Sequence, residues 1–131
     1  MTQSPNLLRF ALAADAVASG ATGLLMLAGA GLLAPLLHVP AGHLMMAGVL
    51  LVPFVAFVAY TATRAVISRA AAHTIVELNV AWTIASFVLL FSGWIAPNAL
   101  GIAFIAGQAL AVLALGGLQY YALRQSALRT A

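Results

Sequence analysis

The sequence of 131 residues contains no cysteine and no lysine. Without cysteine, the chain has no disulfide, no thiolate metal site and no thiol chemistry. Without lysine, it has neither the phosphate-binding lysine of a P-loop nor a Schiff-base nucleophile. These absences exclude several common classes of enzyme.

Charged residues are also scarce, at 5% of the chain, whereas 65% of the residues are hydrophobic. Soluble domains usually carry about a quarter charged residues, because their surface must be solvated. So few charges do not cover a soluble globule of this length, and a lipid bilayer as solvent removes the difficulty. The net charge of +3 does not indicate nucleic-acid binding, because the arginines stand singly between apolar segments. We therefore expect a multi-pass membrane protein in contact with the lipid bilayer.

Four apolar segments are long enough to cross a membrane, which takes roughly 20 residues at 1.5 Å each. They cover residues 8–33, 43–63, 74–94 and 99–121. The connections are short, so neighbouring spans should run in opposite directions. The sequence predicts an all-α fold, with residues 1–131 forming one antiparallel bundle of four transmembrane helices. Asp15 interrupts the first apolar segment, so we expect a retained helix rather than a secretory signal.

The arginines predict the orientation of the bundle. Arg9 precedes the first span, Arg64 and Arg69 lie between the second and third, and Arg124 and Arg129 follow the fourth. All five fall on one side of a four-span topology, which the positive-inside rule places in the cytoplasm. Both termini are therefore predicted to be cytoplasmic.

Two acidic residues lie inside the predicted spans. Asp15 is six positions beyond Arg9, and Glu77 is four positions beyond His73, so both belong to the cytoplasmic third of the membrane. A charged side chain near the bilayer centre costs about 2.5–3.5 kcal/mol on insertion scales, and less near the interface. Two interpretations stay open: a proton or cation site, or structural pairing with Arg9 or Arg64.

Weaker polar groups follow the helical period on the third and fourth spans. Asn79, Thr83 and Ser86 form one stripe, and Gln108 lies close to mid-membrane. Lipid satisfies none of the hydrogen-bonding groups of an amide, so Gln108 should point into the bundle, with a polar atom at about 3 Å. We expect a small cavity between the third and fourth spans, lined by Trp82, Thr83 and Ser86. The alternative is that these groups only hold helices together, at about 0.6 kcal/mol each.

No catalytic or metal-binding arrangement is visible. His38, His43 and His73 lack the spacing of a ligand set and fall on both sides of the predicted membrane, so no zinc site is expected. There is no Ser-His-Asp arrangement and no pair of carboxylates with an aqueous pocket. We expect a non-enzymatic protein with no cofactor, no metal and no catalytic residue.

Two segments together resemble parts of known proteins. The first is Glu77-Leu-Asn79-Val-Ala-Trp82, followed by Ser86. The second is Pro97-Asn-Ala-Leu-Gly101-Ile-Ala-Phe104, then Gln108-Ala, Leu118-Gln-Tyr120 and Leu123-Arg124. They resemble the third and fourth helices of a group of small, uncharacterised four-helix proteins of the bacterial inner membrane. The resemblance implies that architecture and location, and it carries over no catalytic residue.

The residues favour the binding or conduction of a small ligand or ion, through the bundle or between protomers of a homo-oligomer. The candidate ligand- or ion-binding residues are Asp15, Glu77, Asn79, Trp82, Ser86 and Gln108. In this hypothesis the two acids hold a proton or cation and the two amides orient a ligand. The alternative is an accessory or assembly subunit whose polar stripes bond to a larger membrane complex. An enzyme acting on lipid or quinone is the least favoured class.

Overall fold

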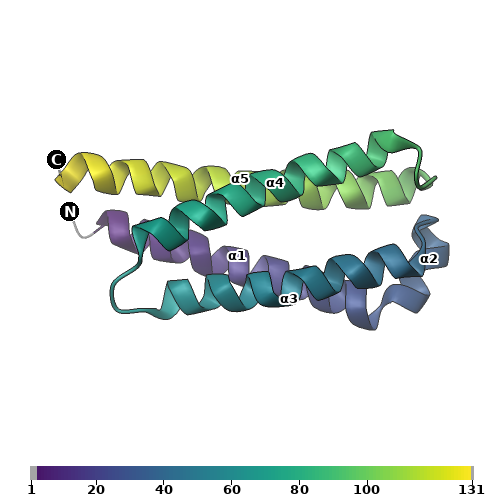
Figure 1. Ribbon diagram of the computed structural model, residues 1–131, viewed down its shortest axis with the longest axis horizontal. Coiled ribbons are helices and arrows are strands. Elements are labelled where there is room, and N and C mark those ends of the chain that lie inside the picture. Colours follow the sequence, from purple (N-terminus) through teal and green to yellow (C-terminus); the bar gives the residue numbers. More distant parts are fainter. Residues whose placement is uncertain (1–2, 131) are drawn as a thin grey trace.

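The computed structural model describes the backbone of residues 3–130 and the side chains of residues 6–125. This part of the chain is helical and contains no strand. The helices are α1 (Gln3–Ala28), α2 (Ala30–Leu37), α3 (Ala41–Thr63), α4 (Arg69–Ser92) and α5 (Ala99–Thr130). Four of them, all except α2, are long and apolar enough to span a membrane. These four lie side by side along the long axis, and α1 begins at the end of the molecule where α5 finishes (Figure 1).

The sequence predicts one helix over residues 8–33. The structure has two, α1 and α2, because the helix is interrupted at Gly29. Gly29 has φ −102° and ψ 7°, between the end of α1 and the start of α2. Pro35, a residue type that commonly ends helices, lies inside α2. The residue that ends α2 is His38, which adopts a left-handed conformation with φ 56°, while the N–H of Val39 bonds to the carbonyl of Ala34.

The other boundaries differ from the predicted ones for local reasons. Helix α4 begins at Arg69, earlier than Thr74, because the hydroxyl of Ser68 accepts a hydrogen bond from the N–H of Ala71 at 3.1 Å and so caps the first turn. It ends before Gly93, whose φ of 82° favours glycine. Helix α5 continues past residue 121 because the Ala-Leu-Arg-Gln that follows is a run of good helix formers.

Packing is uneven around the bundle. Helix α1 packs along α3, α4 packs along α5, and α1 also packs against α5, whereas α3 and α4 contact each other little. Glycines permit the closest approach between α1 and α3: a Cβ added at Gly48 would lie 3.1 Å from the carbonyl oxygen of Gly23. The bundle is therefore closed on three sides and loosely closed between α3 and α4.

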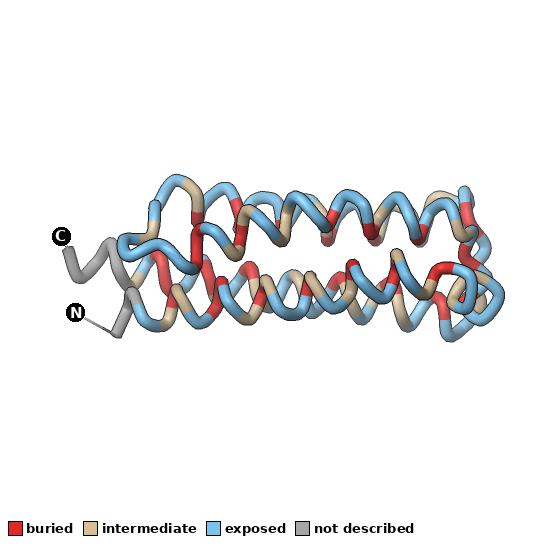
Figure 2. Tube along the Cα trace, turned by 90° about the horizontal axis from the view of Figure 1, so that it is seen from below, coloured by how far each residue is buried: buried red, intermediate tan, exposed pale blue. Residues whose placement is uncertain are grey.

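Two apolar clusters occupy the ends of the bundle. One includes Leu12, Val58 and Ile75, and the other includes Met26 and Leu44. The outer surface is apolar as well, and buried residues turn inward along every long helix while exposed residues turn outward (Figure 2). Such a surface suits a lipid surrounding.

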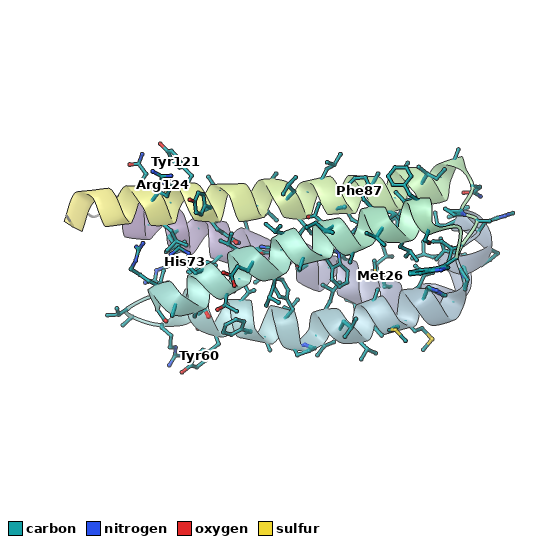
Figure 3. The ribbon with its side chains drawn as sticks, turned by 45° about the horizontal axis from the view of Figure 1, so that its top comes forward. Met26, Tyr60, His73, Phe87, Tyr121 and Arg124 are labelled. Carbon is teal, nitrogen blue, oxygen red and sulfur yellow. The ribbon has the colours of Figure 1, made fainter. Side chains whose placement is uncertain are left out.

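The arginines gather at the end of the bundle where α1 begins. The guanidinium of Arg9 donates to the carbonyls of Ala62, Arg64 and Ala65, and Arg69 donates to the carbonyl of Leu123 at 3.1 Å. Tyr60, His73, Tyr121 and Arg124 lie at this same end (Figure 3). The Arg9 contacts satisfy carbonyls at the end of α3 that lack helical partners.

Candidate ligand-binding site

Asp15 of α1 is the centre of a fully buried polar cluster. Its Oδ1 accepts a hydrogen bond from the Ser19 hydroxyl at 2.8 Å. Its Oδ2 accepts from the side-chain amides of Asn79 on α4 and Gln119 on α5, each at 2.8 Å. Asp15 and Gln119 are 0% exposed and Asn79 is 1% exposed. An ionised carboxylate only accepts hydrogen bonds, so three donors from three helices satisfy it.

The two amides of this cluster have fixed orientations. The Asn79 amide nitrogen also donates to Oε1 of Gln119 at 3.1 Å, and the Gln119 amide nitrogen also donates to the carbonyl of Ala11 at 3.4 Å. Each NH₂ group therefore uses both of its hydrogens. The Asn79 oxygen is left facing away from the carboxylate, and within residues 6–125 it accepts no hydrogen bond.

The predicted structural pairing of Asp15 with Arg9 is not formed. Arg9 donates to carbonyls at the end of α3, and the donors at Asp15 are the neutral side chains of Ser19, Asn79 and Gln119. The carboxylate is thus hydrogen-bonded but has no cation beside it among the described side chains.

Glu77 does not join the cluster. It is exposed, whereas Asn79, two residues further along α4, is buried. Two residues turn a helix by about 200°, so the two side chains must point in nearly opposite directions. Asp15 therefore contacts Asn79, and not Glu77, on the inward face of α4.

Gln108 points into the bundle, as predicted. Its Oε1 accepts from the indole N–H of Trp82 at 2.8 Å, and its Nε2 donates to the Ser86 hydroxyl at 3.1 Å and to the Ile105 carbonyl at 2.8 Å. Ser86 in turn donates to the carbonyl of Trp82 at 2.8 Å. These contacts join α4 to α5 and hold the Trp82 ring in one orientation.

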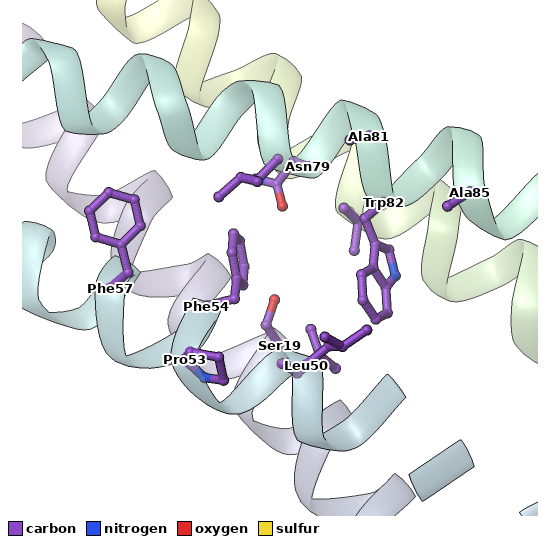
Figure 4. Close-up of a pocket in the computed structure, with 12 residues that line it drawn as sticks. Ser19, Leu50, Pro53, Phe54, Phe57, Asn79, Ala81, Trp82 and Ala85 are labelled. Carbon is purple, nitrogen blue, oxygen red and sulfur yellow. The ribbon is translucent and has the colours of Figure 1, made fainter. Parts of the chain in front are cut away.

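A cavity of about 510 Å³ lies between α3 and α4. Its walls are apolar and aromatic, with Phe54 and Phe57 on α3 and Trp82 on α4, and it reaches Ser19 of α1 and Asn79 (Figure 4). The sequence predicts a cavity between the third and fourth spans instead, which are α4 and α5. The larger cavity does not lie there, because α4 and α5 pack closely, whereas α3 and α4 do not. A smaller cavity does have residues of both α4 and α5 in its lining.

Of the three residues expected to line a cavity, Trp82 and Ser86 do so, whereas Thr83 lines neither of these two cavities. Thr83 lies in the α4–α5 contact, where its hydroxyl donates to the carbonyl of Ala109 at 3.2 Å. Ser86 and Gln108 line a neighbouring cavity of about 240 Å³. Both cavities touch Trp82, so they adjoin along the α3–α4 face.

Two side-chain oxygens face the larger cavity. Figure 4 shows the oxygen of Asn79 and the oxygen of Ser19 pointing toward each other across it. The Ser19 hydroxyl donates to Asp15, and the Asn79 amide donates to Asp15 and Gln119, so both side chains present acceptor oxygens to the cavity. Two of the predicted residues, Asn79 and Trp82, therefore line one pocket, and a third, Asp15, is hydrogen-bonded to Asn79 behind it.

Gln119 and Ser19 are site residues that the sequence-based prediction of the site omits. Ser19 lies one turn beyond Asp15, where a hydroxyl can reach the carboxylate. Gln119 is separated from Gln108 by eleven residues, close to three full turns, so both lie on one face of α5. That shared face was the available signal, but it does not show which helix the face contacts.

Gly116 provides the space for the buried Asn79. A Cβ added at Gly116 would lie 3.1 Å from the Cβ of Asn79, whereas one added at Gly117 would meet nothing within 4 Å. Alanine gains a similar helix propensity at either position. We expect Gly116→Ala to be less stable than Gly117→Ala by about 1 kcal/mol, measured by equilibrium unfolding in mixed micelles. Equal stability would mean that Asn79 is free to shift.

Among the residues that the structure describes, no three His, Asp or Glu side chains lie close enough together to hold a metal ion. Comparisons with family models, with curated proteins and with solved structures find no match to this chain. The resemblance to four-helix proteins of the bacterial inner membrane stays a prediction. The class of protein is defined by the fold alone: a helical protein with four helices able to span a membrane.

Proposed function

We propose that this protein binds a small, mainly apolar molecule in the cavity between α3 and α4, and that it performs no catalysis. The observation that supports this most is the cavity of about 510 Å³ with its aromatic walls and two polar atoms. Ligand pockets are typically about 300–1,000 Å³, mostly apolar, with a few polar groups that orient the ligand. The cavity matches that pattern in size and in lining.

The ligand reaches the cavity sideways, from the lipid. Leu50, Pro53, Leu78 and Ala81 border the cavity and are exposed on the outside of the bundle. An apolar molecule dissolved in the membrane meets this opening without passing through water.

The membrane arrangement belongs to the same proposal. The four long helices cross a bacterial inner membrane in alternating directions, with both termini in the cytoplasm. The gathering of Arg9, Arg64, Arg69 and Arg124 at one end supports this orientation. Reporter fusions in the α3–α4 connection and in the α2–α3 connection would give opposite locations.

Fluorescence of Trp82 tests the proposed binding. The chain has two tryptophans, so Trp94→Phe leaves Trp82 as the only one. In nanodiscs, a terminally brominated medium-chain n-alkanol should quench Trp82 along a saturable curve. Ala81→Phe places a phenyl ring at the rim of the cavity, where it occupies space that the ligand would fill. We expect it to weaken this binding by about tenfold, because the ligand then buries less apolar surface.

Ala114→Phe is the matched control. Ala114 is exposed on α5 and is not among the residues that line the cavity. Quenching of Trp82 by the alkanol in Ala114→Phe should therefore equal that in the parent protein. Quenching that rises without saturation and is the same in all three proteins would contradict the proposal, because it would report only partition into lipid.

One observation favours the alternative, an accessory subunit of a larger membrane complex. Glu77 is exposed on α4, about one turn inside the predicted membrane, where lipid gives a carboxylate no partner. A cationic side chain of another subunit, or of a second copy of the chain, would satisfy it.

A further inference from the structure

The polar atoms that face the α3–α4 cavity are acceptors. The Asn79 amide donates its two hydrogens to Asp15 and Gln119, and the Ser19 hydroxyl donates its hydrogen to Asp15. Asn79 is 1% exposed, and its oxygen accepts no hydrogen bond among residues 6–125. A ligand that fits must therefore bring hydrogen-bond donors.

The same hydrogen bonds connect the cavity to the charge on Asp15. A group that donates to a carboxylate becomes polarised, and its own oxygen becomes a stronger acceptor. Asn79 and Ser19 both donate to the carboxylate at 2.8 Å and both turn their oxygens into the cavity (Figure 4). An ionised Asp15 therefore places its negative charge one side chain away from the cavity, in a region with few other polar groups.

Among the side chains of residues 6–125, no cation neutralises this charge. Arg9 and Arg69 bond to backbone carbonyls at one end of the bundle. A buried carboxylate without a positive partner is costly in an apolar surrounding. A positively charged ligand in the cavity would lower that cost.

The walls of the cavity also suit a cation with apolar substituents. Phe54, Phe57 and Trp82 line it, and the faces of such rings attract ammonium groups within about 6 Å of the ring centroid. A bare metal ion fits poorly, because Ca²⁺ and Mg²⁺ take about six or more oxygen ligands and the side chains of the cavity offer two, from Ser19 and Asn79.

We propose that the ligand of the α3–α4 cavity is a lipophilic organic cation, an ammonium group that bears N–H donors and an apolar chain. The ammonium donates to the oxygens of Asn79 and Ser19, with Asp15 behind them, and the chain lies between Phe54 and Trp82. This inference rests on the proposed function and adds the sign of the ligand's charge.

Three probes with one brominated chain and different head groups test the charge. In the Trp94→Phe protein in nanodiscs, a primary alkylamine, an alkanol and an alkanoate are titrated against Trp82 fluorescence. We expect the amine to bind about tenfold or more tightly than the alkanol. Its positive charge is separated from the Asp15 carboxylate by only one polar side chain, and a low dielectric constant strengthens their attraction. The alkanoate should bind most weakly.

Asp15→Asn separates charge from shape. Asparagine can accept from both amides with its oxygen and donate to the Ser19 hydroxyl with its nitrogen, so we expect the fold to persist. In this variant the amine and the alkanol should bind about equally, while alkanol binding remains. Thermal unfolding of the variant verifies that it is folded.

The outcomes are distinguishable. Equal binding of amine and alkanol in the parent protein, or an undiminished preference in Asp15→Asn, would overturn the charge inference and leave the apolar cavity as a binding site. Saturable quenching by none of the probes would reject the proposed function itself.

Discussion

Asp15→Ala should lower the free energy of unfolding by about 2–4 kcal/mol. Alanine removes the acceptor of three hydrogen bonds at once, from Ser19, Asn79 and Gln119. A buried donor left without a partner costs about 1–3 kcal/mol. The two amides retain their contact with each other at 3.1 Å, and loss of the buried charge recovers part of the desolvation cost. The net expectation is therefore below the sum of three broken bonds.

The other acid of the spans is the control for this prediction. Glu77 is exposed, so Glu77→Ala should change the free energy of unfolding by no more than about 0.5 kcal/mol. Equilibrium unfolding in mixed micelles compares the two variants with the parent protein. If Asp15→Ala were as stable as Glu77→Ala, the cluster would contribute nothing to the association of α1 with α4 and α5.

Gly101→Ala should destabilise the protein by about 2–3 kcal/mol, because its new methyl group would collide with backbone. A Cβ at this position would lie 2.2 Å from the carbonyl oxygen of Leu37 and 2.8 Å from the Cβ of Pro97. The same carbonyl accepts from the N–H of Asn98 at 3.2 Å, and Asn98 also donates to the carbonyl of Leu36 at 2.9 Å. A carbonyl held in this way cannot move without breaking the contact between α2 and the start of α5.

Gly107 gives the matched comparison on the same helix. A Cβ added there would meet nothing within 4 Å, and alanine is favoured over glycine in a helix by about 1 kcal/mol. Gly107→Ala should therefore be as stable as the parent protein or slightly more so. A melting temperature of Gly101→Ala that matches that of Gly107→Ala would show that the α2–α5 contact yields easily.

The inward orientation of Gln108 was predictable because it depends on one residue and its solvent. Lipid offers an amide no partner, so the side chain had to turn inward wherever the neighbouring helices lay. Its partners, Trp82 and Ser86, were also among the predicted residues, since they lie one turn apart on α4.

The partners of Asp15 were not predictable in the same way. The helical period assigns Asn79 and Gln119 to the inward faces of their helices, but it does not say which helices meet. Asp15 contacts both because α1 packs against α5 and because Gly116 lets Asn79 approach. The pairing with Arg9 failed for the same reason, since the end of α3 lies nearer to that guanidinium.

The sequence by itself determined that the protein has four helices able to span a membrane, because apolar length and the scarcity of charge are properties of the chain before it folds. It also determined that the arginines follow or precede the spans in a consistent pattern. The tertiary structure alone decided where the cavity lies and which oxygens face it. The cavity exists because α3 pairs with α1 and α4 pairs with α5, and the choice of partners depends on surfaces of two helices at once, which no single segment encodes.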